Sequence, residues 1–554
     1  MDQSPVYATL FSYDLLLHLF EHIHLCGETG SSTLASCTRV CRAWEEPASY
    51  VLWRDLASFR PLWNLLAGRD FSGEAKYLSA YWQYIDPEDF VKDVVERQPE
   101  RWKHFLRRAS YVREVGAAAC QKSELAFIRV LTKYNGGQTF LPSLQRLSWR
   151  HAVPTDTSVL LLASQSLQDL EMSVSRLGSE STGGAAFATP QRYDDYHDVD
   201  PVFVGLAAAA PSLARFSVAG REGPGLAMLP SILELTRLRE LCLFNQSLVL
   251  SADHLRPILA SLGSLEVLFA RIGDFNHIGV PVHAPNLLEL RLQGSSKDLC
   301  GVLSGFLDTP HLRVLSLKSV DGEYSQMDHH LFPLIASATF ARSLRIVSVV
   351  VLNDPSEIVW NDPTATSPSY SAIIRPLLGL RDLEDVEICL ANAIIPCGDE
   401  DIAEIARAWQ RIQSICLAYS PIGARTRPPL TSLQHFADHC PELRQLSMTK
   451  LTIPDDIEVP PVARSPPHPL MYLDLKMTFA VSLNHGRLEK VLLAQYINHL
   501  FPNLVLRDAE VLGARRPISL TPRYFTWGAV EQEIREIRSQ RLASRGAELG
   551  VATV

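Results

Sequence analysis

The residues best placed for metal chemistry lie near the start of the chain. His18, His22 and His24 form an H-x3-H-x-H pattern, which can put two imidazoles on one face of a helix. No carboxylate or Cys stands at a fixed spacing that would complete a ligand set. A polar helix face is therefore the better interpretation of these histidines.

Cys37 and Cys41 are one helical turn apart, as zinc ligands can be, but Val40 and Trp44 share their face. This pattern indicates small apolar packing residues. The ten cysteines of the chain are widely spaced and include no C-x-x-C pair, which is typical of reduced thiols rather than a disulfide framework.

Sequence motifs of catalysis are absent. The chain contains no G-x-S-x-G, Walker A, H-E-x-x-H or G-x-G-x-x-G motif. The glycine-rich string nearest to such a loop, residues 219–228, lacks the Lys and the Ser or Thr that a phosphate-binding loop needs. We therefore expect no catalytic residues, no metal and no cofactor.

The composition excludes several classes of partner. Of the 554 residues, 47% are hydrophobic and 20% are charged, and the net charge is −9. The chain has no basic run, which argues against nucleic acid, and no long uncharged apolar stretch, which argues against a membrane span. The first residues include Asp2 and Asp14 and no basic region, so we expect no signal peptide and a cytoplasmic or nuclear location.

The elements that position any site come from a repeat. A phrase of the form L-x-x-L-x-L recurs along the chain, as in PSLQRLSW (residues 142–149) and PHLRVLSL (residues 310–317). Successive copies are 22 to 46 residues apart, and the gap of 46 indicates one hidden or replaced copy. The first apolar anchors are Leu144, Leu167, Leu213, Leu238, Leu265, Leu287, Leu312, Leu344, Leu383, Ile412, Leu443 and Leu470.

Each phrase ends with strand-like alternation, and most are preceded by a helix-like stretch, as at residues 251–262. One strand and one helix in about 25 residues is the plan of the leucine-rich repeat. We expect an α/β fold, a solenoid with a curved parallel sheet and outer helices, preceded by a small all-α domain. The alternative is an ordinary α/β sheet domain with leucine-rich strands.

The expected domains are an N-terminal helical domain at residues 9–56, a helical linker or cap at 57–138, the repeat solenoid at 139–510 and a C-terminal cap with a polar helix at 511–554. Loop inserts are expected near residues 175–200 and 353–369, where Gly, Ser, Thr, Pro and acidic residues gather.

The first 56 residues have a different sequence pattern from the repeats. An amphipathic helix, which Ser12 can cap, is followed by a polar linker (residues 24–33) and by a second helix that ends or kinks at Pro47. About 50 residues holding Trp44 and Trp53 make too small a core alone, so they must pack against the rest of the chain or a partner.

This segment resembles an F-box, with Leu19-Phe20 in the first helix, V-C-R-x-W at residues 40–44 and Leu52-Trp53 after it. The whole chain resembles the fungal type of F-box protein with irregular leucine-rich repeats, although Phe11-Ser12 stands where the family usually has Leu-Pro. The resemblance implies docking on a Skp-type adaptor of a cullin-RING ubiquitin ligase. The docking surface, or the small core beneath it, would consist of Leu15, Leu16, Leu19, Phe20, Ile23, Val40, Cys41, Trp44, Leu52 and Trp53.

The repeats would then hold a protein substrate. Side chains that flank the last two leucines of a phrase point to the concave face, because strand side chains alternate. The candidate substrate-binding residues are Phe244, Phe269, Arg271, Arg291 and Lys318, followed by an acidic stretch at Asp385 and Glu387. Alternatively, the phenylalanines pack under a loop, and the chain is a scaffold whose N-terminal helices only cap the solenoid.

Overall fold

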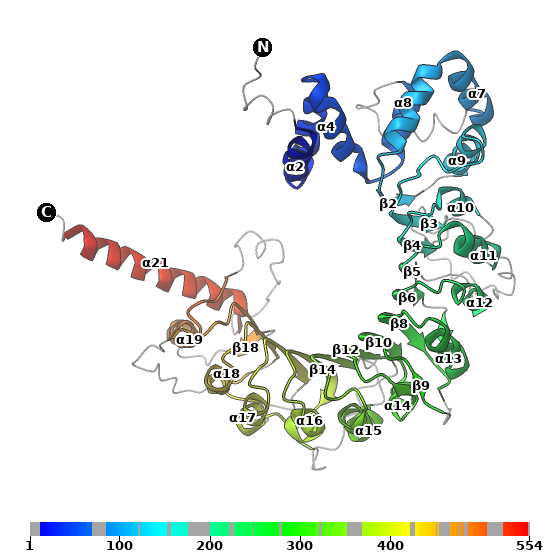
Figure 1. Ribbon diagram of the computed structural model, residues 1–554. Coiled ribbons are helices and arrows are strands. Elements are labelled where there is room, and N and C mark those ends of the chain that lie inside the picture. The colour runs from blue at the N-terminus through cyan, green and yellow to red at the C-terminus, as the bar shows by residue number, and fades with distance from the viewer. Residues whose placement is uncertain are drawn as a thin grey trace, which may run out of the picture. The chain divides into compact units, whose positions relative to one another are not determined.

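The computed structural model divides into two compact units, Met1–Arg271 and Ile272–Val554. In each unit, parallel strands stand side by side with helices along one face of the sheet (Figure 1). The structure describes residues 12–68, 85–119, 122–151, 157–174, 200–220, 226–245, 248–275, 280–320, 324–351, 368–420, 427–449, 451–453, 466–475, 478–480, 486–506 and 524–551.

The first unit begins with three helices, α2 (Tyr13–His24), α3 (Glu28–Cys37) and α4 (Arg42–Arg54). Its sheet then runs in the order β1-β2-β3-β4-β5-β6-β8, with all neighbours parallel. These strands are β1 (Asp55–Leu56), β2 (Glu114–Ala119), β3 (Arg146–His151), β4 (Asp169–Val174), β5 (Arg215–Gly220), β6 (Glu240–Asn245) and β8 (Val267–Ile272), and β7 (Val249–Leu250) pairs with β8.

The remaining helices of the first unit connect these strands. They are α5 (Arg60–Ala67), α7 (Pro87–Arg97), α8 (Pro99–Ala109), α9 (Lys122–Tyr134), α10 (Ser158–Leu162), α11 (Asp200–Ala209), the 3-10 helix η2 (Leu226–Met228), α12 (Leu229–Ile232) and α13 (Ala252–Ser261).

The second unit repeats the plan with the order β10-β12-β13-β14-β15-β16-β17. The strands are β10 (Glu289–Gly294), β12 (Val314–Ser319), β13 (Ile346–Val351), β14 (Asp385–Ile394), β15 (Ser414–Ser420), β16 (Gln445–Met448) and β17 (Tyr472–Leu475). Two small sheets pair β9 (Val282–His283) with β11 (Leu307–Asp308) and β18 (Thr478–Ala480) with β19 (Tyr524–Thr526). The helices are α14 (Ser296–Leu303), α15 (Tyr324–Ser337), α16 (Tyr370–Leu378), α17 (Asp399–Ala408), η5 (Leu430–Ser432), α18 (Leu433–His439), α19 (Gly486–Leu500) and α21 (Trp527–Val551).

The leucine phrases form the core of both units. All twelve anchors are buried, and none exposes more than 3% of its surface. Each anchor sits in a turn before its strand, as where the Leu265 N–H donates to the Leu262 carbonyl at 2.9 Å. In the strand that follows, residues alternate between buried and partly exposed positions, as throughout β8. The expected α/β leucine-rich-repeat solenoid is confirmed.

The gap of 46 residues between Leu167 and Leu213 adds no strand to the sheet between β4 and β5. Strand β4 pairs directly with β5, with Asp169 opposite Arg215. Of the two alternatives, a hidden copy or a replaced one, this pairing favours a replaced copy. Of the loop inserts expected near residues 175–200 and 353–369, residues 175–199 and 353–367 lie outside the described residues.

The N-terminal helices also differ from expectation. The segment expected as a polar linker contains most of α3, and the break falls before Arg42, because the backbone of Cys41 is extended (φ −160°, ψ 165°). Gly30 allows α3 to approach the Ile23 carbonyl, where a Cβ would clash. Pro47 lies inside α4, where burial of neighbouring side chains offsets the one backbone hydrogen bond that proline removes. Ser12 precedes α2 but makes no side-chain cap.

Candidate protein-interaction surfaces

Helices α2, α3 and α4 share a small core of their own. Phe20 is fully buried at its centre and packs edge to face against Trp44, with ring centroids 5.6 Å apart. Leu34 comes from α3 and Val51 from α4. We call α2–α4 the helical module. The full set of buried core residues is Leu16, Phe20, Leu34, Cys37, Ala48 and Val51, with Leu17, Ile23, Trp44, Tyr50 and Leu52 packed around it.

The candidate docking residues divide between this core and the surface. Leu16 and Phe20 belong to the core, whereas Leu15, Leu19 and Val40 expose 51%, 49% and 62% of their surfaces. The remaining candidates, Ile23, Cys41, Trp44, Leu52 and Trp53, are partly buried. The module therefore folds around one set of apolar side chains and leaves another set in solvent.

One side of the module is joined to the part of the first unit that follows it, at α8 and the residues before β2. Arg108 of α8 is 7% exposed and donates to Glu45 of α4 at 3.0 Å, and its burial lowers the pKa of its guanidinium. The Tyr50 and Tyr111 rings meet at 5.6 Å, and Arg113 lies over the Tyr50 ring. The exposed leucines of α2 are not part of these contacts.

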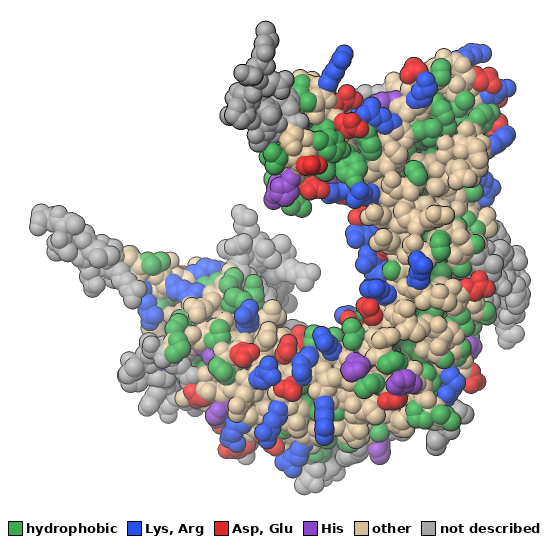
Figure 2. Space-filling model, in the orientation of Figure 1, with side chains coloured by type: hydrophobic (Ala, Val, Ile, Leu, Met, Phe, Trp, Pro, Cys, Tyr) green, Lys and Arg blue, Asp and Glu red, His purple; other side chains and the backbone are tan. Residues whose placement is uncertain are grey.

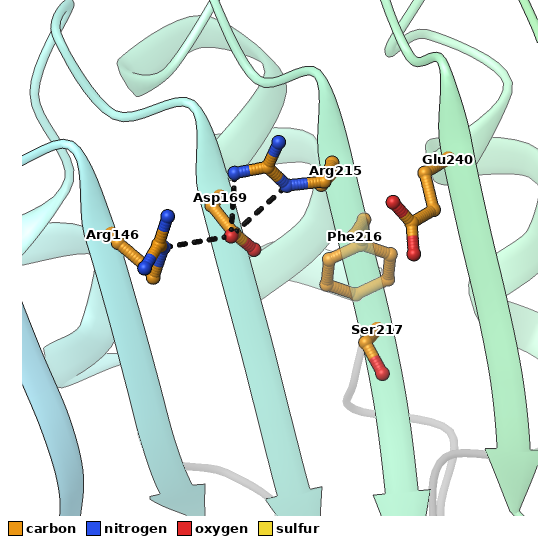
Figure 3. Close-up of a pocket in the computed structure, with 6 residues that line it drawn as sticks. All are labelled: Arg146, Asp169, Arg215, Phe216, Ser217 and Glu240. Carbon is orange, nitrogen blue, oxygen red and sulfur yellow. Dashed lines mark hydrogen bonds and ion pairs between the residues drawn. The ribbon is translucent and has the colours of Figure 1, made fainter. Parts of the chain in front are cut away.

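A row of alternating charges crosses the exposed face of the sheet in the first unit. It consists of the residues at or near the start of β2 to β6: Glu114, Arg146, Asp169, Arg215 and Glu240. Arg146 pairs with Glu114 at 2.9 Å and with Asp169 at 3.1 Å, and Arg215 pairs with Asp169 at 2.9 Å. Figure 3 shows both guanidinium groups directed at Asp169 from either side, with Glu240 on the next strand. We call these five residues the charged row.

The charged row borders a shallow hollow of about 360 Å³. Space-filling atoms over these strands show basic and acidic side chains side by side (Figure 2). Glu114 first, and then Asp169, raise the pKa of Arg146, which keeps its charge fixed. The hollow is lined by Arg146, Asp169, Arg215, Phe216, Ser217 and Glu240.

The candidate substrate-binding residues occupy exposed or partly exposed positions of their strands. In the first unit, Phe244 on β6 exposes 54% of its surface, and its ring centroid lies 5.1 Å from that of Phe269 on β8. Arg271 lies two residues further along the same face of β8. The phenylalanines therefore form an aromatic pair on the sheet.

In the second unit, Arg291 on β10 and Lys318 on β12 are exposed. They are offset along the strands, because Arg291 lies opposite Ser316 and Lys318 opposite Gln293. Arg291 also pairs with Glu289 on its own strand. Further along this sheet, burial and the neighbouring Glu387 raise the pKa of Asp385.

The histidines and cysteines considered as metal ligands do not form a metal site among the described residues. No cluster of three His, Cys, Asp or Glu side chains suited to a metal exists among the described residues. The exposed rings of His18 and His22 on α2 meet edge to face with centroids 4.7 Å apart. Burial raises the pKa of the Cys440 thiol to about 12. Within the described ranges, no helix has both the length and the hydropathy of a membrane span.

Comparisons with known proteins give matches among solved structures, all at low sequence identity. No protein-family model matches the sequence, and no curated protein matches it. Among solved structures, the yeast Rad7–Elc1 complex matches at 13% identity and a TM-score of 0.30, over 66% of this chain and 87% of that one. The TLR13–ssRNA13 complex matches at 12% and 0.29, over 69% and 57% of the two chains. The Leptospira interrogans leucine-rich-repeat protein LIC12759 matches at 12% and 0.27, over 73% and 98%.

The charged row was not among the candidate residues from the sequence. Its signal is present in the phrases, because the residue before the second leucine alternates in sign from Arg146 to Asp169, Arg215 and Glu240. These charges form a row only if their strands are adjacent and in register. The pairing of β4 with β5 across the long gap meets this condition.

Proposed function

We propose that this protein is an F-box-type substrate adaptor. The helical module would dock on a Skp-type protein of a cullin-RING ubiquitin ligase, and the repeats would hold a protein substrate. The observation that carries the proposal is the division of the module into a closed core and exposed leucines. The V-C-R-x-W motif at residues 40–44 and Leu52-Trp53 support the same family.

The exposed leucines favour a partner on energetic grounds. Leu15 and Leu19 are one turn apart on α2, so both can enter one apolar groove. Burying the exposed half of a leucine contributes about 1 kcal/mol, since full burial contributes about 1.5–3 kcal/mol. Leu15, Leu19 and Val40 together would supply about 3 kcal/mol, and the partly buried aromatic residues add to this.

The chain itself would perform no chemical step. A partner enzyme would transfer ubiquitin, while this protein holds the substrate near it and so raises the effective concentration of its lysines. Such a complex would act in the cytoplasm or the nucleus. The substrate surface would include Phe244, Phe269 and Arg271 in the first unit and Arg291 and Lys318 in the second.

A second candidate function is a scaffold outside any ligase, with the helical module as a cap of the solenoid. The contact that favours it is the Arg108–Glu45 pair, which joins the module to α8. The two functions differ in whether the exposed side of α2 is ever covered.

Co-expression with a Skp-type adaptor tests the proposal. We expect a stable complex that co-elutes in gel filtration and is lost in the Leu15→Ser/Leu19→Ser variant. Leu25→Ser is the matched control, since Leu25 is 79% exposed but lies beyond the end of α2. A wild-type chain that stays monodisperse and shows no adaptor binding would overturn the proposal and favour the scaffold.

A further inference from the structure

The charged row leaves a surplus of negative charge beside the hollow. Its two arginines are paired with Glu114 and Asp169, so two charges of each sign cancel. Glu240 accepts a weak hydrogen bond from the Cys242 thiol at 3.4 Å, and no Lys or Arg pairs with it in the part of the chain that the structure describes. Exposed Glu171 on β4 likewise has no such pair within the described ranges.

These two glutamates flank one point of the sheet. Ser217 on β5 lies directly opposite Glu171 on one side and opposite Cys242 on the other. Glu240 is two residues before Cys242, so its side chain is diagonal to Ser217. Ser217 and Glu240 both line the hollow. A cation placed over Ser217 would therefore lie between two carboxylates that form no ion pair with Lys or Arg among the described residues.

The aromatic pair stands at a fixed offset from this point. Phe244 lies opposite Ala219, so it is one strand over from Ser217 and two residues along. With strands about 4.8 Å apart and a rise of about 3.3 Å per residue, Ser217 and Phe244 are about 8 Å apart at their Cα atoms. Side chains at positions i and i+2 of an extended peptide share a face and are about 6.6 Å apart, which fits this offset.

We propose that this face of the first unit binds an extended segment of a partner protein in which Lys or Arg is followed two residues later by a leucine or an aromatic residue. The cation would lie between Glu171 and Glu240, and the apolar side chain would pack on Phe244 and Phe269. Charge complementarity selects this partner, since an acidic segment would meet two unpaired carboxylates. The inference deepens the proposed function, because the segment would belong to the substrate.

Fluorescence polarisation with labelled eight-residue peptides tests this on the full chain. One peptide carries Lys at position 4 and Leu at position 6 in a Gly/Ser/Thr background, and two others carry Glu at position 4 or Ser at position 6. We expect the Lys-x-Leu peptide to bind about fivefold more tightly than either, the upper range for one exposed ion pair.

Variants of the chain test whether the preference for Lys and Leu in the peptide arises at this face of the sheet. Glu171→Gln/Glu240→Gln should abolish the preference for Lys, and Phe244→Ser the preference for Leu. Glu234→Gln is the control, since Glu234 is exposed but precedes β6. Equal binding of all peptides, tighter binding of the Glu peptide, or a Lys preference that survives in the double variant would overturn the inference.

The two proposals can fail separately. A wild-type chain that prefers Lys-x-Leu but binds no Skp-type adaptor would refute the ligase function and leave this surface standing. A chain that binds the adaptor through Leu15 and Leu19 but shows no peptide preference would refute only the surface.

Discussion

Replacing Phe20 with alanine should unfold the helical module while leaving the repeats folded. Phe20 is fully buried and contacts Trp44, and truncating such a phenylalanine costs about 3–5 kcal/mol. A core of this size supplies no more than about 3–5 kcal/mol in total. The loss is therefore comparable to the whole stability of α2–α4.

Hydrogen exchange measured by mass spectrometry resolves this local effect, because each segment reports its own opening free energy. Each 1.4 kcal/mol is a factor of ten, so amides of α2 and α4 should exchange about 100 to 5000 times faster in Phe20→Ala. Peptides from β4 to β6 should exchange at the wild-type rate.

Leu15→Ala is the matched control, since Leu15 is half exposed on the same helix. It should leave exchange in α2 within a few-fold of wild type while weakening adaptor binding. Unchanged protection of α2 in Phe20→Ala would refute the assignment of Phe20 to the core. Loss of protection across the whole first unit would refute the independence of the module.

Two further predictions concern the sheets. Asp169→Asn should lower the free energy of unfolding of the first unit, measured by urea denaturation, by about 1 kcal/mol, because it removes the carboxylate that holds both Arg146 and Arg215. Asp93→Asn, which breaks the exposed pair of Asp93 with Arg97, is the control and should lower the free energy of unfolding by less than about 0.5 kcal/mol. Equal losses in the two variants would refute a structural role for the charged row. Asp385→Asn should raise the melting temperature at pH 7, because burial first and Glu387 next raise the pKa of Asp385, so its charged form opposes folding at high pH. The gain should shrink as the pH falls through the folded-state pKa and vanish once the carboxyl is protonated in both states; a gain that persists in acid would contradict this origin.

The leucine phrases made the fold predictable because each anchor has one favourable place, the core. Leu144 and Leu470 are both fully buried although 326 residues separate them in sequence. Strand β2 was not predictable in this way, because its sequence EVGAAA carries no phrase and depends on pairing with β1 and β3.

The candidate site was predictable only in part. Helical periodicity placed Leu15, Leu16, Leu19 and Phe20 on one broad face of α2. It could not tell that Leu16 and Phe20 would enter the core and that Leu15 and Leu19, about 100° around the helix, would not. The position of α3 and α4 decides this, and the break at Cys41 that orients them has no clear sequence signal.

The junction between the helical module and the sheet has a mechanical consequence. Helix α4 ends at Arg54, and β1 begins at the next residue, where the Arg54 carbonyl accepts from the Arg113 N–H at 2.8 Å. No linker residues separate the helical module from the sheet, so a protein bound to α2 would be held at a fixed angle to the strands of the first unit. In the proposed complex, a substrate lysine would then have to reach the ubiquitin donor through the flexibility of the substrate itself, so substrates with flexible segments would be the easiest to modify.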